Sequence, residues 1–61
     1  MNSTTIKNIN TGITKNCDIL FKNEKFLEVV IKNTTIKISF KKKNDIYIGK
    51  YMDMEFISTG N

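Results

Sequence analysis

Six residue types are missing from the chain: Ala, Arg, Gln, Pro, His and Trp. The absence of His removes the commonest general base and metal ligand, and a single Cys excludes a disulfide within the chain. Zinc sites need three or four clustered ligands, and the sequence offers no such cluster. No apolar run approaches the roughly 18 residues of a transmembrane helix, and the first residues are too polar for a secretory signal. We therefore expect a cytoplasmic protein without metal, cofactor or membrane contact.

What remains is a short and basic chain. Its 61 residues predict one small domain over residues 1–61, and ten Lys against six acidic residues give a net charge of +4. Domains below roughly 70–80 residues gain only a few kcal/mol from their core, so we expect either tight packing or self-association into a homo-oligomer. The abundant Ile, Lys and Asn have A/T-rich codons, a composition typical of small domains from phages and mobile elements.

Strands are favoured over helices, because Ile, Val and Thr make up 19 residues whereas Leu occurs twice. β-branched side chains lose rotamer freedom in helices and fit pleated sheets. A tight turn at Asn33-Thr34 places three apolar pairs on one face: Leu27 with Phe40, Val29 with Ile38, and Ile31 with Ile36. The opposite face carries Glu28, Val30, Lys32, Thr35, Lys37, Ser39 and Lys41. This alternation predicts a half-buried antiparallel hairpin.

Two further turns extend this hairpin in both directions. We place them at Asn23-Glu24 and at a three-residue loop over 42–44. They pair Phe21 with Phe26, Leu20 with Leu27, Phe40 with Ile46, and Ile38 with Ile48. Gly49 then interrupts the next strand, since a glycine inside a strand often marks a bend where a sheet curls.

The amino-terminal part has a weaker pattern. A loop over 10–12 would pair Ile9 with Ile13 and place Gly12 in the left-handed region. The following strand carries its apolar residues on one side: Ile13, Cys17, Ile19 and Phe21. Since Leu20 has the opposite phase, this strand must twist or bulge before it joins the central hairpin.

These elements predict an all-β fold, a single small antiparallel meander of about five strands. Curling into a partly closed barrel would remove exposed strand edges, in the manner of SH3-like, Sm-like or OB-like barrels. A variant with a helix over 16–25 is the alternative. The expected core consists of Leu20, Leu27, Val29, Ile31, Ile36, Ile38, Phe40, Ile46, Ile48, Met52, Met54 and Phe56.

The sequence gives little support for catalysis. Cys17 lies in a predicted strand without an imidazole partner, so we expect a buried free thiol. Asp53 and Glu55 share one face of a predicted strand, which is typical of a solvated surface. The glycines are isolated and form no phosphate-binding loop. We therefore expect a non-enzymatic protein.

Apolar side chains on the polar face provide the main functional hypothesis. We expect Phe26, Val30, Tyr47 and Tyr51 to be protein-contact anchors, with Lys37 and Lys41 as a charged rim. The protein would then be a small binding module that docks on a protein partner and blocks it. Phages and mobile elements encode inhibitors of this kind against host or defence machinery.

Three alternatives remain open for the same residues. A small nucleic-acid-binding barrel would use exposed aromatics among lysines, namely Phe26, Tyr47, Lys37, Lys41, Lys42 and Lys43, although the missing Arg argues against it. The amino-terminal hairpin could instead cover these residues in a closed barrel. Finally, the strand over 51–57 could offer an edge for pairing with a partner or a second copy.

Overall fold

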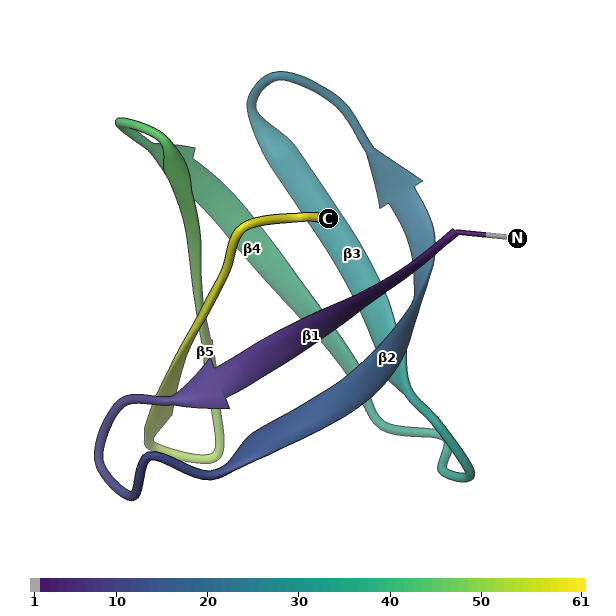
Figure 1. Cartoon of the computed structure of the whole chain (residues 1–61), viewed down its shortest axis with the longest axis vertical. Coiled ribbons are helices and arrows are strands. Elements are labelled where there is room, and N and C mark those ends of the chain that lie inside the picture. Colours follow the sequence, from purple (N-terminus) through teal and green to yellow (C-terminus); the bar gives the residue numbers. More distant parts are fainter. Residues whose placement is uncertain (1) are drawn as a thin grey trace.

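Six antiparallel strands follow one another around a closed barrel in the computed structural model, which describes residues 2–61 (Figure 1). The strands are β1 (Ser3–Asn8), β2 (Thr14–Lys22), β3 (Phe26–Ile31), β4 (Lys37–Lys43), β5 (Ile46–Tyr51) and β6 (Met54–Ser58). Each strand pairs with the next, and β1 pairs with β6 to close the ring. The predicted all-β meander is confirmed, with one strand more than expected and full closure. The alternative helix over 16–25 is wrong, because β2 occupies most of this segment.

The β3–β4 hairpin has the predicted register. Leu27 lies opposite Phe40 and Val29 opposite Ile38, and all four side chains are at most 2% exposed. Because side chains alternate between the two faces of a strand, Glu28 and Ser39 between them point outward, as do the neighbouring Lys37 and Lys41. This hairpin forms the centre of the hydrophobic core.

A bulge in β2 also agrees with the sequence, although the pairing beside it does not. The register shifts between Ile19 and Phe21, which leaves Leu20 exposed rather than buried. Phe21 then lies opposite Glu28 instead of Phe26. The turn lies one residue later than predicted. The Asn23 side chain causes this shift, because its Oδ1 accepts hydrogen bonds from the backbone N–H groups of Lys25 (2.8 Å) and Phe26 (2.7 Å).

The predicted β4–β5 pairing is wrong by three residues. A two-residue turn at Asn44-Asp45 replaces the expected three-residue loop, and Phe40 therefore lies opposite Gly49 rather than Ile46. Since an odd shift exchanges the two faces of a strand, Tyr47 points into the barrel. Ile46 and Ile48 are half-buried, outside the core where they were expected.

Gly49 continues β5 rather than breaking it. A Cβ atom at this position would lie 2.7 Å from the backbone oxygen of Ser39 and 3.0 Å from the ring of Phe40. The glycine is therefore required by the close approach of β5 to the Phe40 ring. β5 therefore passes through Gly49 without the predicted interruption, and the glycine is needed for close packing instead.

The β5–β6 hairpin corrects a further expectation. Met52 and Asp53 form its turn, with φ angles of 50° and 62°, as in the two-residue turns that match strand twist. Met52 and Met54 are exposed and leave the core, whereas Phe56 is buried as predicted. The strand over 51–57 is thus split by a turn. Its second half is paired on both sides, so it offers no free edge for the expected strand pairing.

The amino-terminal hairpin completes the core. Ile6 and Cys17 are fully buried, and the expected burial of the Cys17 thiol is confirmed. Gly12 has the predicted left-handed φ of 77°. The pairing is shifted by one residue, because the Asn8 N–H rather than that of Ile9 bonds the Ile13 carbonyl (2.9 Å). Within residues 2–61, no helix has the length and apolar character needed to cross a membrane.

Candidate functional site

The meander places alternate turns at opposite ends of the barrel. The loops over 9–13, 32–36 and 52–53 gather at one end, which we call the apolar end, at the bottom of Figure 1. The loops over 23–25 and 44–45 gather at the other, which we call the basic end, together with residues 2 and 61. The two names describe the side chains that each end displays.

Exposed hydrophobic side chains concentrate at the apolar end. Seven large hydrophobic residues are exposed in the described chain, and four of them lie here: Ile9 (47%), Ile13 (55%), Met52 (74%) and Met54 (38%). The other three, Leu20, Phe21 and Phe26, lie on or beside the β2–β3 hairpin. Contiguous apolar groups on a monomer surface often mark an interaction site.

A cavity of about 340 Å³ opens among these loops. Its wall is almost entirely apolar and consists of Asn8, Thr11, Ile13, Lys15, Ile31, Ile36, Tyr51, Met54 and Phe56. Tyr51 lies opposite Met54 at the start of the β5–β6 turn, and the Ile31 N–H bonds the Ile36 carbonyl (3.0 Å) at the base of the β3–β4 loop. The volume is at the lower end of the range for ligand pockets.

Asn8 holds the loop beside this cavity in place. Its buried side chain accepts hydrogen bonds at Oδ1 from the backbone N–H groups of Asn10 (2.8 Å) and Thr11 (3.2 Å). Its Nδ2 donates to the Met54 sulfur (3.4 Å), an adaptable acceptor. Asn8 thus links the 9–13 loop to Met54 at the start of β6, so this part of the cavity wall is pre-formed.

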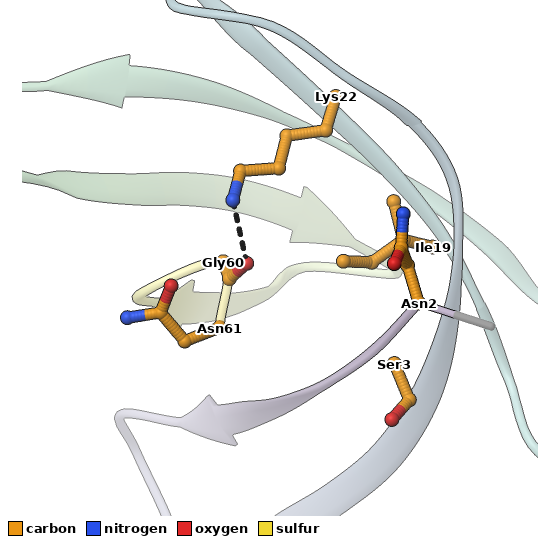
Figure 2. Close-up of a pocket in the computed structure, with 6 residues that line it drawn as sticks. All are labelled: Asn2, Ser3, Ile19, Lys22, Gly60 and Asn61. Carbon is orange, nitrogen blue, oxygen red and sulfur yellow. Dashed lines mark hydrogen bonds between the residues drawn. The ribbon is translucent and has the colours of Figure 1, made fainter.

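The basic end is closed by contacts within the chain. The Lys22 ammonium donates to the Gly60 carbonyl (2.9 Å), as Figure 2 shows, and the Tyr47 hydroxyl donates to the Asn23 carbonyl (2.7 Å). Gly60 lies directly against the Tyr47 ring, where a Cβ atom would approach within 2.8 Å. The hollow that remains is polar and is bordered by Asn2, Ser3, Ile19, Lys22, Gly60 and Asn61.

The structure divides the predicted contact face into separate parts. Phe26 lies opposite Lys41 and Val30 opposite Lys37, so these four residues do form an outer strip on β3 and β4. Tyr47 is only 2% exposed, and its predicted exposure is wrong because of the shifted β4–β5 register. Tyr51 is half-buried and lines the cavity at the apolar end.

The lysine run of the nucleic-acid hypothesis also has a different position. Lys41, Lys42 and Lys43 end β4 rather than form a hairpin tip. The Lys42 ammonium lies 5.6 Å from the centroid of the Tyr47 ring, an attractive cation–π arrangement. Of the six residues proposed for nucleic-acid contact, Lys42 and Tyr47 are therefore engaged with each other.

The groups considered for chemistry are dispersed. Burial, with a smaller effect of the Asp18 charge, raises the pKa of the Cys17 thiol, which disfavours the reactive thiolate. Asp53 lies in a turn and Glu55 on β6 opposite Lys50, so they do not share one strand face. Residues 2–61 contain no group of three His, Cys, Asp or Glu side chains placed to hold a metal.

The sequence interpretation missed most of the cavity wall, although a signal was present. Apolar residues flank every second turn: Ile9 and Ile13, Ile31 and Ile36, Tyr51 and Met54. In an up-and-down meander these turns share one end. The pairs predict a common apolar surface once the strand order is known. Compared with protein-family models, curated proteins and solved structures, the chain matches none, and its residues alone carry the functional argument.

Proposed function

We propose that this protein is a non-enzymatic binding module that docks on a protein partner through its apolar end and blocks it. The observation that carries the proposal is the gathering of Ile9, Ile13, Met52 and Met54 around a pre-formed apolar cavity. Burying such side chains against a partner is favourable, at about 25 cal/mol per Å² of apolar surface removed from water. The A/T-rich composition is consistent with a phage- or mobile-element-encoded inhibitor.

The β5–β6 turn supports the same proposal. Met52 has a positive φ, a conformation that is unusual for a bulky residue, and it displays its side chain to water. Asn and Gly favour this type of turn, so Met52-Asp53 is a less stable choice here, and the Met52 side chain is 74% exposed. A residue in a strained conformation whose side chain is largely exposed supports a functional role for this turn.

A matched set of variants tests this proposal. The apolar-end variants are Ile13→Ser and Met52→Ser. The controls, Leu20→Ser and Phe21→Ser, remove side chains from β2 whose exposure, 49% and 52%, is close to the 55% of Ile13. The tagged proteins are incubated with nuclease-treated lysate of the native host. We expect the parent and the controls to retain one stoichiometric protein, and the apolar-end variants to lose it.

Two results would contradict the proposal. Capture of nucleic acid alone, with no protein after nuclease treatment, would remove the protein partner. Loss of the partner in the β2 controls but not in the apolar-end variants would move the contact surface to β2. Cross-linking of the purified complex then identifies which residues of each protein lie in contact.

A second candidate function is nucleic-acid binding at the basic end. Half of the ten lysines lie in two adjoining segments, over 22–25 and 41–43, which the Lys42 N–H joins to the Lys25 carbonyl (2.7 Å). Such a cluster can neutralise phosphates and would show affinity that falls steeply with salt. Fluorescence anisotropy with a labelled single-stranded oligonucleotide at two salt concentrations tests this. No binding at low salt would eliminate the candidate.

A further inference from the structure

Three lysines occupy strand positions that face the barrel interior. Their cross-strand partners are buried residues that point inward: Lys15 lies opposite Ile6, Lys22 opposite Leu27, and Lys42 opposite Tyr47. Residues directly opposite each other in an antiparallel pair project from the same face of the sheet. An ammonium group is costly to keep beside a core unless it is paired or reaches water.

Two of these three lysines are paired within the chain. The Lys22 ammonium donates to the Gly60 carbonyl, and the Lys42 ammonium lies over the Tyr47 ring. Lys15 differs, because within residues 2–61 its ammonium has no hydrogen-bond, ion-pair or aromatic partner. Its side chain borders the apolar cavity. The cavity therefore has a free cation on an otherwise apolar wall.

Two further polar side chains of the cavity wall, Asn8 and Thr11, are engaged within the chain, and the neutral Tyr51 hydroxyl has no protein partner among the described residues. Asn8 uses both its amide oxygen and its amide nitrogen within the chain, and the Thr11 hydroxyl accepts the Ile13 N–H (3.2 Å). The only ion pair among residues 2–61 joins Lys32 to Asp18 (3.6 Å), so no carboxylate of this part of the chain neutralises Lys15. Lys15 is thus the only charged residue that lines the cavity, and its charge is not neutralised within this part of the chain.

We propose that the cavity receives one large apolar side chain of a partner protein, flanked in the partner sequence by a carboxylate that pairs with Lys15. This inference rests on the proposed docking function and names the chemistry that it requires. The cavity has room for one large apolar side chain, and the free Lys15 ammonium favours a carboxylate next to that side chain. A charge-assisted hydrogen bond beside an apolar wall is stronger than one in open water. The net charge of +4 also favours an acidic partner.

Two peptides that differ in charge alone test the inference. Acetyl-Asp-Phe-Asp amide and acetyl-Asn-Phe-Asn amide are titrated into the full-length ¹⁵N-labelled protein, and amide shifts are followed by NMR. We expect both peptides to shift the amides of the apolar end, including Ile13, Ile36 and Tyr51. The acidic peptide should bind about two- to fivefold more tightly, as expected for a partly exposed ion pair. This preference should decrease as salt rises.

Two lysine variants distinguish the cavity from general electrostatic attraction. Lys15→Gln should abolish the preference for the acidic peptide. Lys32→Gln removes the same charge from the exposed Lys32–Asp18 pair and should preserve that preference. Well-dispersed spectra of both variants confirm that they are folded. A preference that survives in Lys15→Gln would overturn the inference.

Other outcomes also decide the question. Equal affinities of the two peptides, or no shifts at the apolar end at millimolar concentration, would overturn the acidic-anchor inference. Tighter binding of free 4-phenylbutyrate than of the acidic peptide would overturn it in favour of a small-molecule site. The lysate experiment decides separately whether the protein docks on a partner at all, so failure of the docking proposal can be distinguished from failure of the acidic-anchor inference.

Discussion

Interior-facing side chains at the two ends of this barrel have different surroundings. At the basic end, Lys22, Lys42 and Tyr47 all find partners within the chain, and Gly60 packs on the Tyr47 ring. At the apolar end, Lys15 has no partner among the described residues, and a cavity remains. The proposed binding site therefore coincides with the end of the barrel at which packing within the chain is incomplete.

The turns at the two ends also differ in their chemistry. Asn44 and Asp45 form a polar turn at the basic end, whereas Met52-Asp53 forms the equivalent turn at the apolar end. Both turns hold a non-glycine residue at positive φ. Asn tolerates this conformation readily, and Met does not. The turn at the apolar end therefore holds an exposed hydrophobic residue, Met52, in a strained conformation, and the turn at the basic end does not.

The largest expected effect comes from disrupting the hydrophobic core, which both ends of the barrel share. Val29→Lys places an unpaired charge in a fully buried position, which costs several kcal/mol, comparable to the entire stability of so small a domain. We expect the variant to be unfolded by circular dichroism. Lys37→Glu, on the outer face opposite Val30, should change the melting temperature little. A cooperative melting transition in Val29→Lys would contradict the core described here.

A smaller effect is expected when the strained turn is replaced, which makes the turns at the two ends more alike. Replacing Met52-Asp53 by Asn-Gly supplies the favoured residues for a two-residue hairpin turn. The free energy of unfolding should rise by about 1–2 kcal/mol, as measured by urea denaturation, while capture of the protein partner is lost. The control is Asp53→Gly alone, which keeps Met52 and should retain capture. Unchanged stability of the double variant would show that the native turn is not strained.

The next effect is a loss of unfolding free energy from the basic end alone. Tyr47→Phe removes the hydroxyl that donates to the Asn23 carbonyl and leaves that carbonyl without this donor. The loss should be about 1 kcal/mol of unfolding free energy, with peptide binding at the apolar end unchanged. Tyr51→Phe is the matched change at the other end, where the hydroxyl has no protein partner among residues 2–61, and it should cost less than about 0.5 kcal/mol. Equal losses would remove the contrast between the ends.

The smallest effect concerns the buried thiol between the two ends. Because burial raises the pKa of Cys17 in the folded state, the unfolded chain deprotonates first as pH rises. The thiol's contribution to stability is therefore fully present below the unfolded pKa, near 8.5, and is lost as pH rises towards the folded pKa. Urea denaturation between pH 7 and 9.5 should show this decline. Cys17→Ala should reduce it, and an identical slope in that variant would assign the decline to other groups.

How much of the fold could be predicted depended on the uniqueness of each local pattern. The β3–β4 register was predictable because a one-residue slip would place lysines in the core. The β4–β5 register was not, because apolar residues occupy both phases: Ile46 and Ile48 on one side, Tyr47 and Tyr51 on the other. The observed register brings Gly49 close to Phe40, and this contact exists only in the folded barrel.

The candidate site was less predictable than the fold. Barrel closure joins strands from the two ends of the chain, through the pairs Lys7–Ile57 and Asn8–Phe56. A buried hydrogen bond between the Thr4 and Ser58 hydroxyls (3.1 Å) spans the same boundary. Local periodicity carries no information about such distant contacts. For the same reason, the gathering of three loops around one cavity could not be inferred from any single segment.

The positions of residues 2 and 61 have a practical consequence. Both lie at the basic end, where they border the same polar hollow, and β1 and β6 run from there to the loops of the apolar end. An affinity handle, a fluorescent protein or a solid support joined at either position would emerge on the side remote from Met52. The apolar loops would then stay accessible to a binding partner, and the domain offers a small scaffold for grafted loop sequences.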